Sequence, residues 1–191
     1  MSTIVVVAKG GVAAIAADTL TTWGYSSKDS AEYVVNHQKI IQLGNSYLAI
    51  SGPAAAQLAI KAYFANVSDI SLKSVDTIFD AWTKLHSALK EQYFLNPREG
   101  REDAFESTRV DVLIANSEGI FGVDTHRAVQ QFSRYYAYGN GSQHALGAMY
   151  AVYTQSGLSA EDIARIGIQA AAEFGTDTGL PLICHTVALS R

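Results

Sequence analysis

The 191-residue sequence contains one cysteine, three prolines and no apolar stretch of about 18 residues, the length needed to cross a membrane. A lone Cys184 excludes an internal disulfide framework and is typical of a protein of the reducing cytoplasm. Three prolines and no low-complexity tract leave no obvious linker. We therefore expect residues 1–191 to form a single domain around one sizeable core.

An excess of positive charge is also missing. The chain has 14 Lys and Arg against 18 Asp and Glu, a net charge of -4 at pH 7, and its basic residues are scattered. This balance argues against nucleic acid as the main partner. The N-terminus has no basic residue before its short apolar run, so it does not resemble a signal peptide. The five histidines lack metal-site spacing. We expect a cytoplasmic protein with no membrane partner, metal or small-molecule cofactor.

Hydrophobic and turn patterns predict hairpins that alternate with pairs of helices. Two continuous apolar runs, residues 4–8 and 12–17, flank Lys9-Gly10-Gly11 and predict a hairpin with strands buried on both faces. Further hairpins are predicted over residues 39–51 and 110–123. Helices are predicted over residues 53–67, 75–95, 141–155 and 159–174, and a closing strand over 182–189. This order suggests antiparallel sheets between helix layers.

The predicted hairpin registers bring polar groups to the strand ends. If the first hairpin turns through three residues, Ser2 lies opposite Asp18. In the second hairpin, a two-residue turn places Lys39 opposite Ile50, close to Gly52 at the start of the next helix. A nucleophilic hydroxyl, an orienting carboxylate, an amine and an anion-binding helix N-terminus could then form one site. The registers do not show whether the two hairpins adjoin.

Each of these residues also has an ordinary structural interpretation. Ser2 could be a permissive small second residue, and Asp18 a turn residue after a strand. Lys39 could be an exposed charge on an edge strand, where lysine is common. Gly52 could simply precede a helix that begins with proline. The four residue types in this order favour a catalytic site over four independent coincidences.

The same residues resemble a known family, the proteasome β subunits and HslV, which are N-terminal-nucleophile hydrolases. The resemblance rests on Ser2 followed by "TIVVV", on "AAIAAD" ending at Asp18, and on "TTWG", "KIIQL", "AISGPAAA" and "YAYGNGSQHALGAMYA". It covers almost the whole chain and is most specific in the first 55 residues. Within the family, the chain is most similar to the proteasome homologue of betaproteobacteria. The resemblance implies an α+β fold, a four-layer αββα sandwich of two antiparallel sheets between helix layers.

The resemblance also implies roles for individual residues. Once Met1 is removed, the hydroxyl of Ser2 would attack a peptide carbonyl, and its α-amine, which titrates near pH 8, would act as the general base. Lys39 would favour the alkoxide or keep the amine neutral, and Asp18 would hold Lys39 in place. The backbone N–H of Gly52 would stabilise the oxyanion.

Further residues are implied to bind substrate or to support the site. Thr22 would pair with the backbone of an extended peptide. The other implied positions are Ile50 and Ala54 for substrate, and Asn140, Gly141, Ser142 and Asp177 as supporting residues.

The chain departs from the family pattern at several positions. Serine replaces the usual threonine nucleophile and lacks the methyl group that fixes the rotamer. The family's Gly-Ser-Gly is Gly139-Asn140-Gly141 here, so a supporting hydroxyl is missing unless Ser142 supplies it. Ala56 stands where the family has an aspartate. A retained Met1 would leave Ser2 without a free amine.

The sequence therefore supports two functional interpretations. The first is a peptidase subunit of a homo-oligomeric stacked double ring that cleaves peptides or unfolded proteins, with an ATP-dependent unfoldase as a candidate partner. The alternative is a weakly active or inactive ring-forming scaffold or binding compartment, which Asn140, Ala56 and a blocked N-terminus would favour. Ring symmetry and substrate preference do not follow from the sequence.

Overall fold

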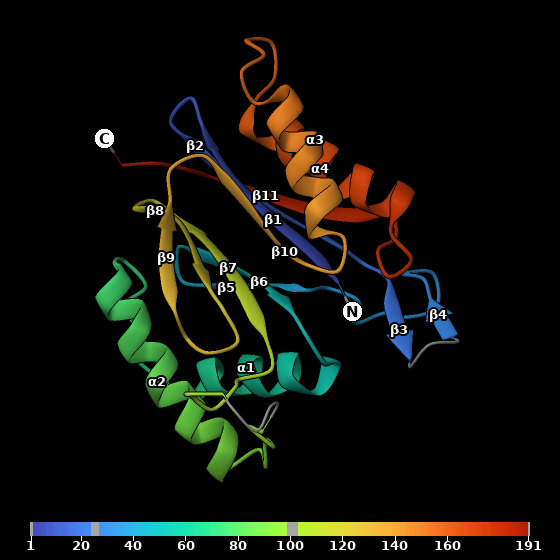
Figure 1. Cartoon of the computed structure of the whole chain (residues 1–191). Helices are drawn as coiled ribbons and strands as arrows, with labels where there is room; N and C mark the ends of the chain where they lie inside the picture. The colour runs from blue at the N-terminus through green and yellow to red at the C-terminus, as the bar shows by residue number, and fades with distance from the viewer. Residues whose placement is uncertain (1, 24–26, 99–102, 191) are drawn as a thin grey trace.

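Two antiparallel sheets face each other between two layers of helices in the computed structural model of the chain, which describes residues 2–23, 27–98 and 103–190 (Figure 1). The first sheet has the order β10 (Tyr135–Gly139), β1 (Thr3–Lys9), β2 (Val12–Asp18) and β11 (Leu182–Ala188). The second has the order β5 (Ile40–Leu43), β6 (Ser46–Ser51), β7 (Asp111–Asn116), β8 (Gly119–Val123) and β9 (Val129–Phe132). A separate ribbon pairs β3 (Thr21–Trp23) with β4 (Ser27–Asp29).

Each sheet carries its helices on the face turned away from the other sheet. The helices α3 (Ser142–Val152) and α4 (Ala160–Phe174) cover the first sheet, while α1 (Ala54–Asn66) and α2 (Val75–Glu91) cover the second (Figure 1). The predicted α+β, four-layer αββα sandwich is therefore confirmed.

Strand β1 shows why the N-terminal apolar runs are continuous. Val5 and Val7 pack against the α3 and α4 side, whereas Ile4 and Val6 pack against the second sheet. All four side chains are fully buried. Because successive strand residues point to opposite faces, a strand buried on both faces needs apolar residues at every position.

The register of the first hairpin differs from the prediction by one residue. Its turn contains only Gly10 and Gly11, both at positive φ (61° and 77°), as a two-residue type I′ turn requires. The strands then pair Ile4 with Ala17, so the next position places Thr3, and not Ser2, beside Asp18. The prediction that Ser2 lies opposite Asp18 was wrong because Lys9 belongs to the strand and not to the turn.

The second hairpin has the predicted register. Ile40 pairs with Ala49, and the N–H of Ile50 donates to the carbonyl of Lys39 at 2.9 Å. The two hairpins lie in facing sheets, which brings the start of β5 close to the end of β2. The structure thus shows that the two hairpins adjoin, which the sequence did not show.

The helices lie close to their predicted positions. Pro53 is the N-cap of α1, and Ser159 and Asp162 form the predicted capping box of α4. Helix α2 ends at Glu91, four residues before its predicted end. Strands β3, β4, β9 and β10 were not predicted.

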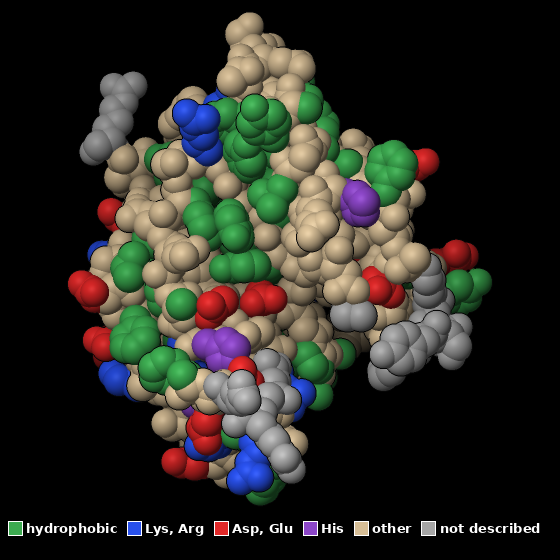
Figure 2. Space-filling view, viewed as in Figure 1, with side chains coloured by type: hydrophobic (Ala, Val, Ile, Leu, Met, Phe, Trp, Pro, Cys, Tyr) green, Lys and Arg blue, Asp and Glu red, His purple; other side chains and the backbone are tan. Residues whose placement is uncertain are grey.

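The surface carries mixed charge. Lys, Arg, Asp and Glu side chains are scattered between hydrophobic side chains over the face in Figure 2. Within the described residues, no helix combines the length and the apolar character that membrane crossing requires.

Candidate active site

The carboxylate of Asp18, at the end of β2, organises the candidate site. Asp18 is fully buried, and its Oδ1 accepts hydrogen bonds from the backbone N–H of Thr3 (2.9 Å) and from Lys39 Nζ (2.8 Å). Its Oδ2 accepts from the backbone N–H groups of Leu20 (3.1 Å) and Gly179 (3.2 Å). A charge removed from water requires such partners. Asp18 therefore joins β1, the segment after β2, the start of β5 and the segment before β11.

Lys39 is the cation of this arrangement. It is 6% exposed, and its Nζ donates to Asp18 and, at 2.7 Å, to the carbonyl oxygen of Leu20. Burial lowers the pKa of Lys39, and the attraction and hydrogen bond of Asp18 oppose that shift. The alternative in which Lys39 is an exposed edge charge is therefore excluded. Within the described residues, these two bonds use two of the three N–H groups of the ammonium.

A pocket of about 230 Å³ brings three of the four predicted catalytic residues together, and the fourth, Asp18, reaches it through Lys39. Ser2, Lys39 and Gly52 all line it, with Thr22 and Ala54 among the other lining residues. Ser2 immediately precedes β1, and its carbonyl accepts a hydrogen bond from the Asn140 N–H at 3.1 Å. Met1 lies outside the described residues.

Gly52 connects the end of β6 to the N-terminus of α1. The carbonyl of the next residue, Pro53, accepts from the N–H groups of Ala56 and Gln57 and so begins the helix. Ala56 itself is almost wholly buried and belongs to the core between the second sheet and its helices. The predicted place of Gly52 beside a helix N-terminus is thus what the structure shows.

The three predicted substrate residues occupy different positions around this pocket. Thr22 lies in β3, and Ala54 is the exposed first residue of α1. Ile50 is 1% exposed and lines an adjoining cavity of about 340 Å³, which Lys39 and Ala54 also line. The two cavities therefore share a wall.

The sequence interpretation missed a hydroxyl pair beside Asp18. The Oγ1 atoms of Thr3 and Thr178 are 2.5 Å apart, and both residues are buried. The N–H of Gly141 donates to Thr3 Oγ1 at 3.0 Å. A two-residue Gly-Gly turn would have revealed Thr3 from the sequence, but no local pattern places residue 178 next to residue 3.

The supporting residues have mixed outcomes. Gly141 is the N-cap of α3 and contacts Thr3, as described above, and Asn140 Nδ2 donates to Asp177 Oδ2 at 2.7 Å. Asn140 therefore joins Asp177 through its side chain and Ser2 through its backbone N–H. Ser142 begins α3, and its role as a replacement hydroxyl stays a prediction.

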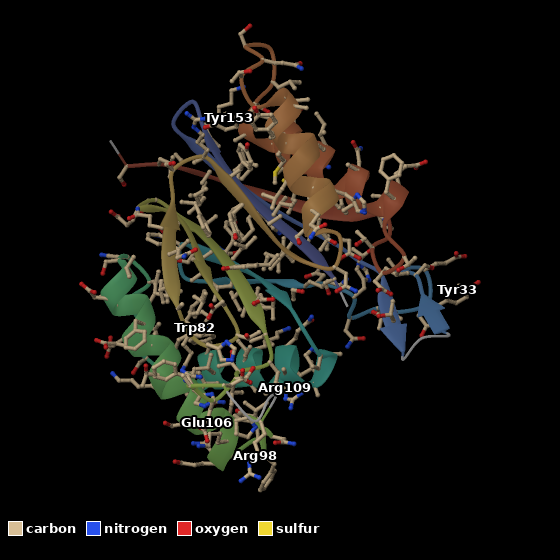
Figure 3. All side chains as sticks on the ribbon, in the orientation of Figure 1. Tyr33, Trp82, Arg98, Glu106, Arg109 and Tyr153 are labelled. Carbon is tan, nitrogen blue, oxygen red and sulfur yellow. The ribbon has the colours of Figure 1, made fainter. Side chains whose placement is uncertain are left out.

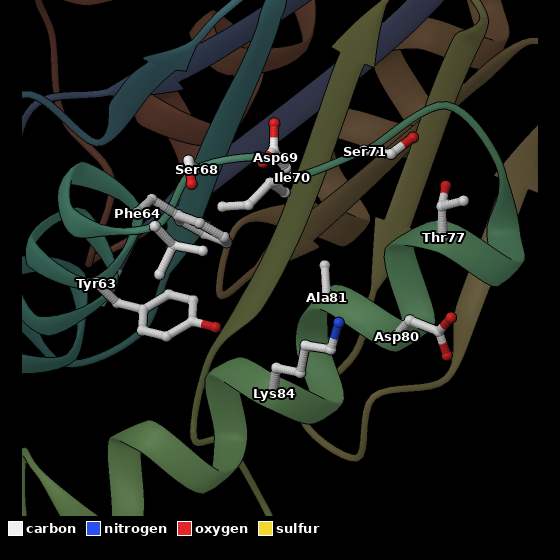
Figure 4. Close-up of a pocket in the computed structure, with 11 residues that line it drawn as sticks. Tyr63, Phe64, Ser68, Asp69, Ile70, Ser71, Thr77, Asp80, Ala81 and Lys84 are labelled. Carbon is white, nitrogen blue, oxygen red and sulfur yellow. The ribbon is translucent and has the colours of Figure 1, made fainter.

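A second pocket of about 210 Å³ lies away from these residues, between the end of α1, the connection after it and α2 (Figure 4). Its polar lining includes Tyr63, Asp80 and Lys84. No group of three or more His, Cys, Asp or Glu residues in the described part of the chain is arranged to hold a metal ion.

Comparisons with known proteins find relatives among solved structures only. Protein-family models and curated proteins give no match. Among solved structures, the chain is similar to Thiobacillus denitrificans BPH in complex with epoxomicin: 52% identical, TM-score 0.93, covering 99% of this chain and 100% of that chain. A second structure of Thiobacillus denitrificans BPH is 53% identical, covers 98% of both chains and has a TM-score of 0.94.

A more distant structure shares the fold alone. Eukaryotic HslV from Trypanosoma brucei is 17% identical, with a TM-score of 0.74 over 97% of this chain and 99% of that chain. Identity above 50% along nearly the full length of two chains is far more than a common fold requires, and the protein thus belongs to the proteasome and HslV-type family of N-terminal-nucleophile hydrolases.

Proposed function

We propose that this chain is a self-compartmentalising peptidase subunit whose nucleophile is Ser2, made N-terminal by the removal of Met1. One observation carries the proposal: Lys39, which forms a buried 2.8 Å ion pair with Asp18, lines the same pocket as Ser2 and Gly52. An ion pair in the interior is costly to bury, so its place beside a hydroxyl and a helix N-terminus favours a catalytic role over a stabilising one.

The proposed reaction uses the N-terminal residue as both nucleophile and base. The α-amine of Ser2 accepts the hydroxyl proton, directly or through water, while Oγ attacks the peptide carbonyl carbon. The resulting oxyanion is stabilised by the N–H of Gly52. Collapse breaks the C–N bond, and the leaving amine takes the proton. A water molecule then attacks the ester, releases the acyl peptide and restores the hydroxyl.

Lys39 lowers the barrier electrostatically in this scheme. Its positive charge favours the developing alkoxide and disfavours a second positive charge on the α-amine of Ser2. Asp18 and the carbonyl of Leu20 fix the ammonium in one position, so the charge needs little reorganisation during the reaction. Asp18 acts through Lys39 and is a positioning residue.

The proposed substrate is a peptide or an unfolded protein in an extended conformation. Thr22, in the short strand β3, can offer backbone hydrogen bonds to such a chain. Ala54 at the rim and Ile50 in the adjoining cavity would then meet its side chains. Epoxomicin, bound by the similar Thiobacillus denitrificans protein, is a suitable probe for the pocket.

We further propose that the subunits form a stacked double ring with the pockets inside. Every helix exposes large apolar side chains, which a lone subunit would leave in water: Leu58, Phe79, Tyr150 and Phe174 are each at least 50% exposed. An ATP-dependent unfoldase as partner rests on the family resemblance alone.

The ring proposal predicts a large assembly in solution. Light scattering should give a mass many times the 20.5 kDa of one chain. Apolar faces that are buried between subunits should make this mass stable to moderate dilution. A stable monomer would contradict the proposal.

Replacing Ser2 should separate the nucleophile from the rest of the protein. Ser2→Ala keeps a small second residue but removes the hydroxyl, so cleavage of a fluorogenic peptide should fall to background while the assembly stays intact. Ser2→Thr keeps the hydroxyl and should remain active. A third protein, with an untrimmed extension before Met1, should be inactive because an amide nitrogen is not a base.

Two results would contradict this assignment. Full cleavage by Ser2→Ala would place the nucleophile elsewhere, and full cleavage by the extended protein would place the base elsewhere. An intact wild-type assembly that does not cleave any peptide would favour the scaffold alternative.

Lys39→Ala should reduce both activity and stability. Removal of a preorganised charge from the site should slow cleavage by about 100-fold or more. It also leaves the Asp18 carboxylate buried without its counter-ion, which should cost about 3–5 kcal/mol in the free energy of unfolding. Initial cleavage rates and urea unfolding measure the two effects.

Lys90→Ala is the matched control, because Lys90 is also in an ion pair but lies on the surface, 38% exposed, with Glu106. It should change stability by about 1 kcal/mol at most and leave cleavage unchanged. Lys39→Ala protein that cleaves as fast as the wild type would exclude Lys39 from the mechanism.

A further inference from the structure

The backbone at Gly52, which carries the proposed oxyanion donor, packs closely against residues 109 and 110. Gly52 has a φ of 155°, and a Cβ atom there would lie 2.7 Å from Val110 Cγ1 and 2.8 Å from the Arg109 carbonyl oxygen. The β6–β7 ladder leads to this contact, since Ser51 pairs with Asp111 in the preceding position. The position of Gly52 is therefore set by the backbone of residues 109–110.

Arg109 holds an uncommon backbone conformation at this contact. Its φ is 59°, in the left-handed region that non-glycine residues rarely adopt. Its N–H donates to Ser107 Oγ at 2.9 Å. The conformation brings the Arg109 carbonyl against Gly52, so the strained residue is in direct contact with the oxyanion turn.

The side chain of Arg109 fastens this conformation. Its Nε donates to the Asn96 carbonyl at 2.7 Å, and its Nη2 donates to the Arg98 carbonyl. Arg109 and Arg98 lie at the same end of the molecule, beside the α1 and α2 layer (Figure 3). The rigid guanidinium fork can hold two carbonyls at once, whereas a lysine ammonium is a point donor on a flexible stem.

A cavity next to Gly52 gives its backbone space to move if the contact with Arg109 is lost. About 380 Å³ of space lies between Arg109, Asp111, Gly52 and the Gly139-Asn140 segment. Gly52 thus lines both the Ser2 pocket and this cavity. Without the Arg109 contact, the peptide unit at Gly52 has open space beside it into which it can shift.

We infer that Arg109 is a positioning residue for the proposed reaction. The hydrogen bonds of its guanidinium hold its backbone in the left-handed conformation, and its carbonyl then keeps Gly52 in the position that stabilises the oxyanion. The inference rests on the proposed function, in which Gly52 stabilises the oxyanion. Arg109 contacts the oxyanion turn and not the substrate. Its loss acts on kcat, because a displaced donor weakens binding of the transition state more than binding of the peptide.

The test compares Arg109→Gly with Arg127→Gly. Arg127 is also an arginine at positive φ (70°), and its Nη1 donates to the Glu106 carbonyl at 2.5 Å, but the three atoms nearest to a Cβ at Gly52 belong to Val110 and Arg109. Glycine accepts the backbone conformation in both cases, so each variant removes only the side chain. Arg109→Lys, which keeps the positive charge without the rigid fork, is the intermediate variant.

The measurements are kcat and KM for a fluorogenic peptide, expressed per active site. Active sites are counted by intact mass after prolonged treatment with epoxomicin, so misfolded molecules do not lower kcat. Arg109→Gly should lower kcat about 10-fold to 100-fold and change KM by less than about 3-fold. Arg109→Lys should restore part of the loss, and Arg127→Gly should keep kcat within about 2-fold of the wild type.

Equal kcat values per active site for Arg109→Gly and Arg127→Gly, in an active wild-type background, would overturn this inference and leave the proposed function standing. If Arg109→Gly does not fold, Arg109→Lys decides the matter by the same criterion: a normal kcat overturns the inference. A wild-type protein that neither cleaves peptide nor gains an epoxomicin adduct overturns the proposed function, and the inference with it.

Discussion

The buried carboxylate of Asp18 is the constraint on which the candidate site depends. It receives one backbone N–H group from the start of β1, one from the segment after β2 and one from the segment before β11, together with the ammonium of Lys39 beside the facing sheet. An unpaired carboxylate in this position would cost several kcal/mol, so the four segments must meet there for the chain to fold. The same requirement brings the ammonium of Lys39 into the pocket that Ser2 lines. The geometry that satisfies a buried charge is thus also the geometry on which the proposed reaction depends.

The sandwich supports this arrangement from both sides. Strands β1 and β2 are apolar at nearly every position because both of their faces are covered, and polar residues appear only where the strands end. The site therefore lies at the edge of the two sheets, between a rigid core and the solvent. Gly52 packs against different residues, Val110 and the carbonyl of Arg109. The buried charge pair and the proposed oxyanion donor therefore depend on separate parts of the chain, so substitutions can alter one without the other.

Much of this could be predicted from local patterns, and the failures have physical causes. Continuous apolar runs and glycine turns predicted the hairpins, and Ser159-x-x-Asp162 predicted the start of α4. The first register was wrong by one residue because a Gly-Gly turn and a Lys-Gly-Gly loop look alike in sequence. Strands β9 and β10, which lie in different sheets, were missed because the two residues that join them, Ser133 and Arg134, carry no glycine or asparagine turn signal. The Thr3–Thr178 contact joins residues 175 positions apart, and only the folded chain brings them together.

The central claim is that Ser2 carries both the nucleophile and a free α-amine. Its most direct test is peptide mass spectrometry of the tag-free protein after treatment with epoxomicin. The account predicts that the N-terminal peptide begins at Ser2, without Met1, and that the epoxomicin mass is added to this peptide and to no other. An N-terminal peptide that retains Met1, or an adduct on a different peptide, would contradict it.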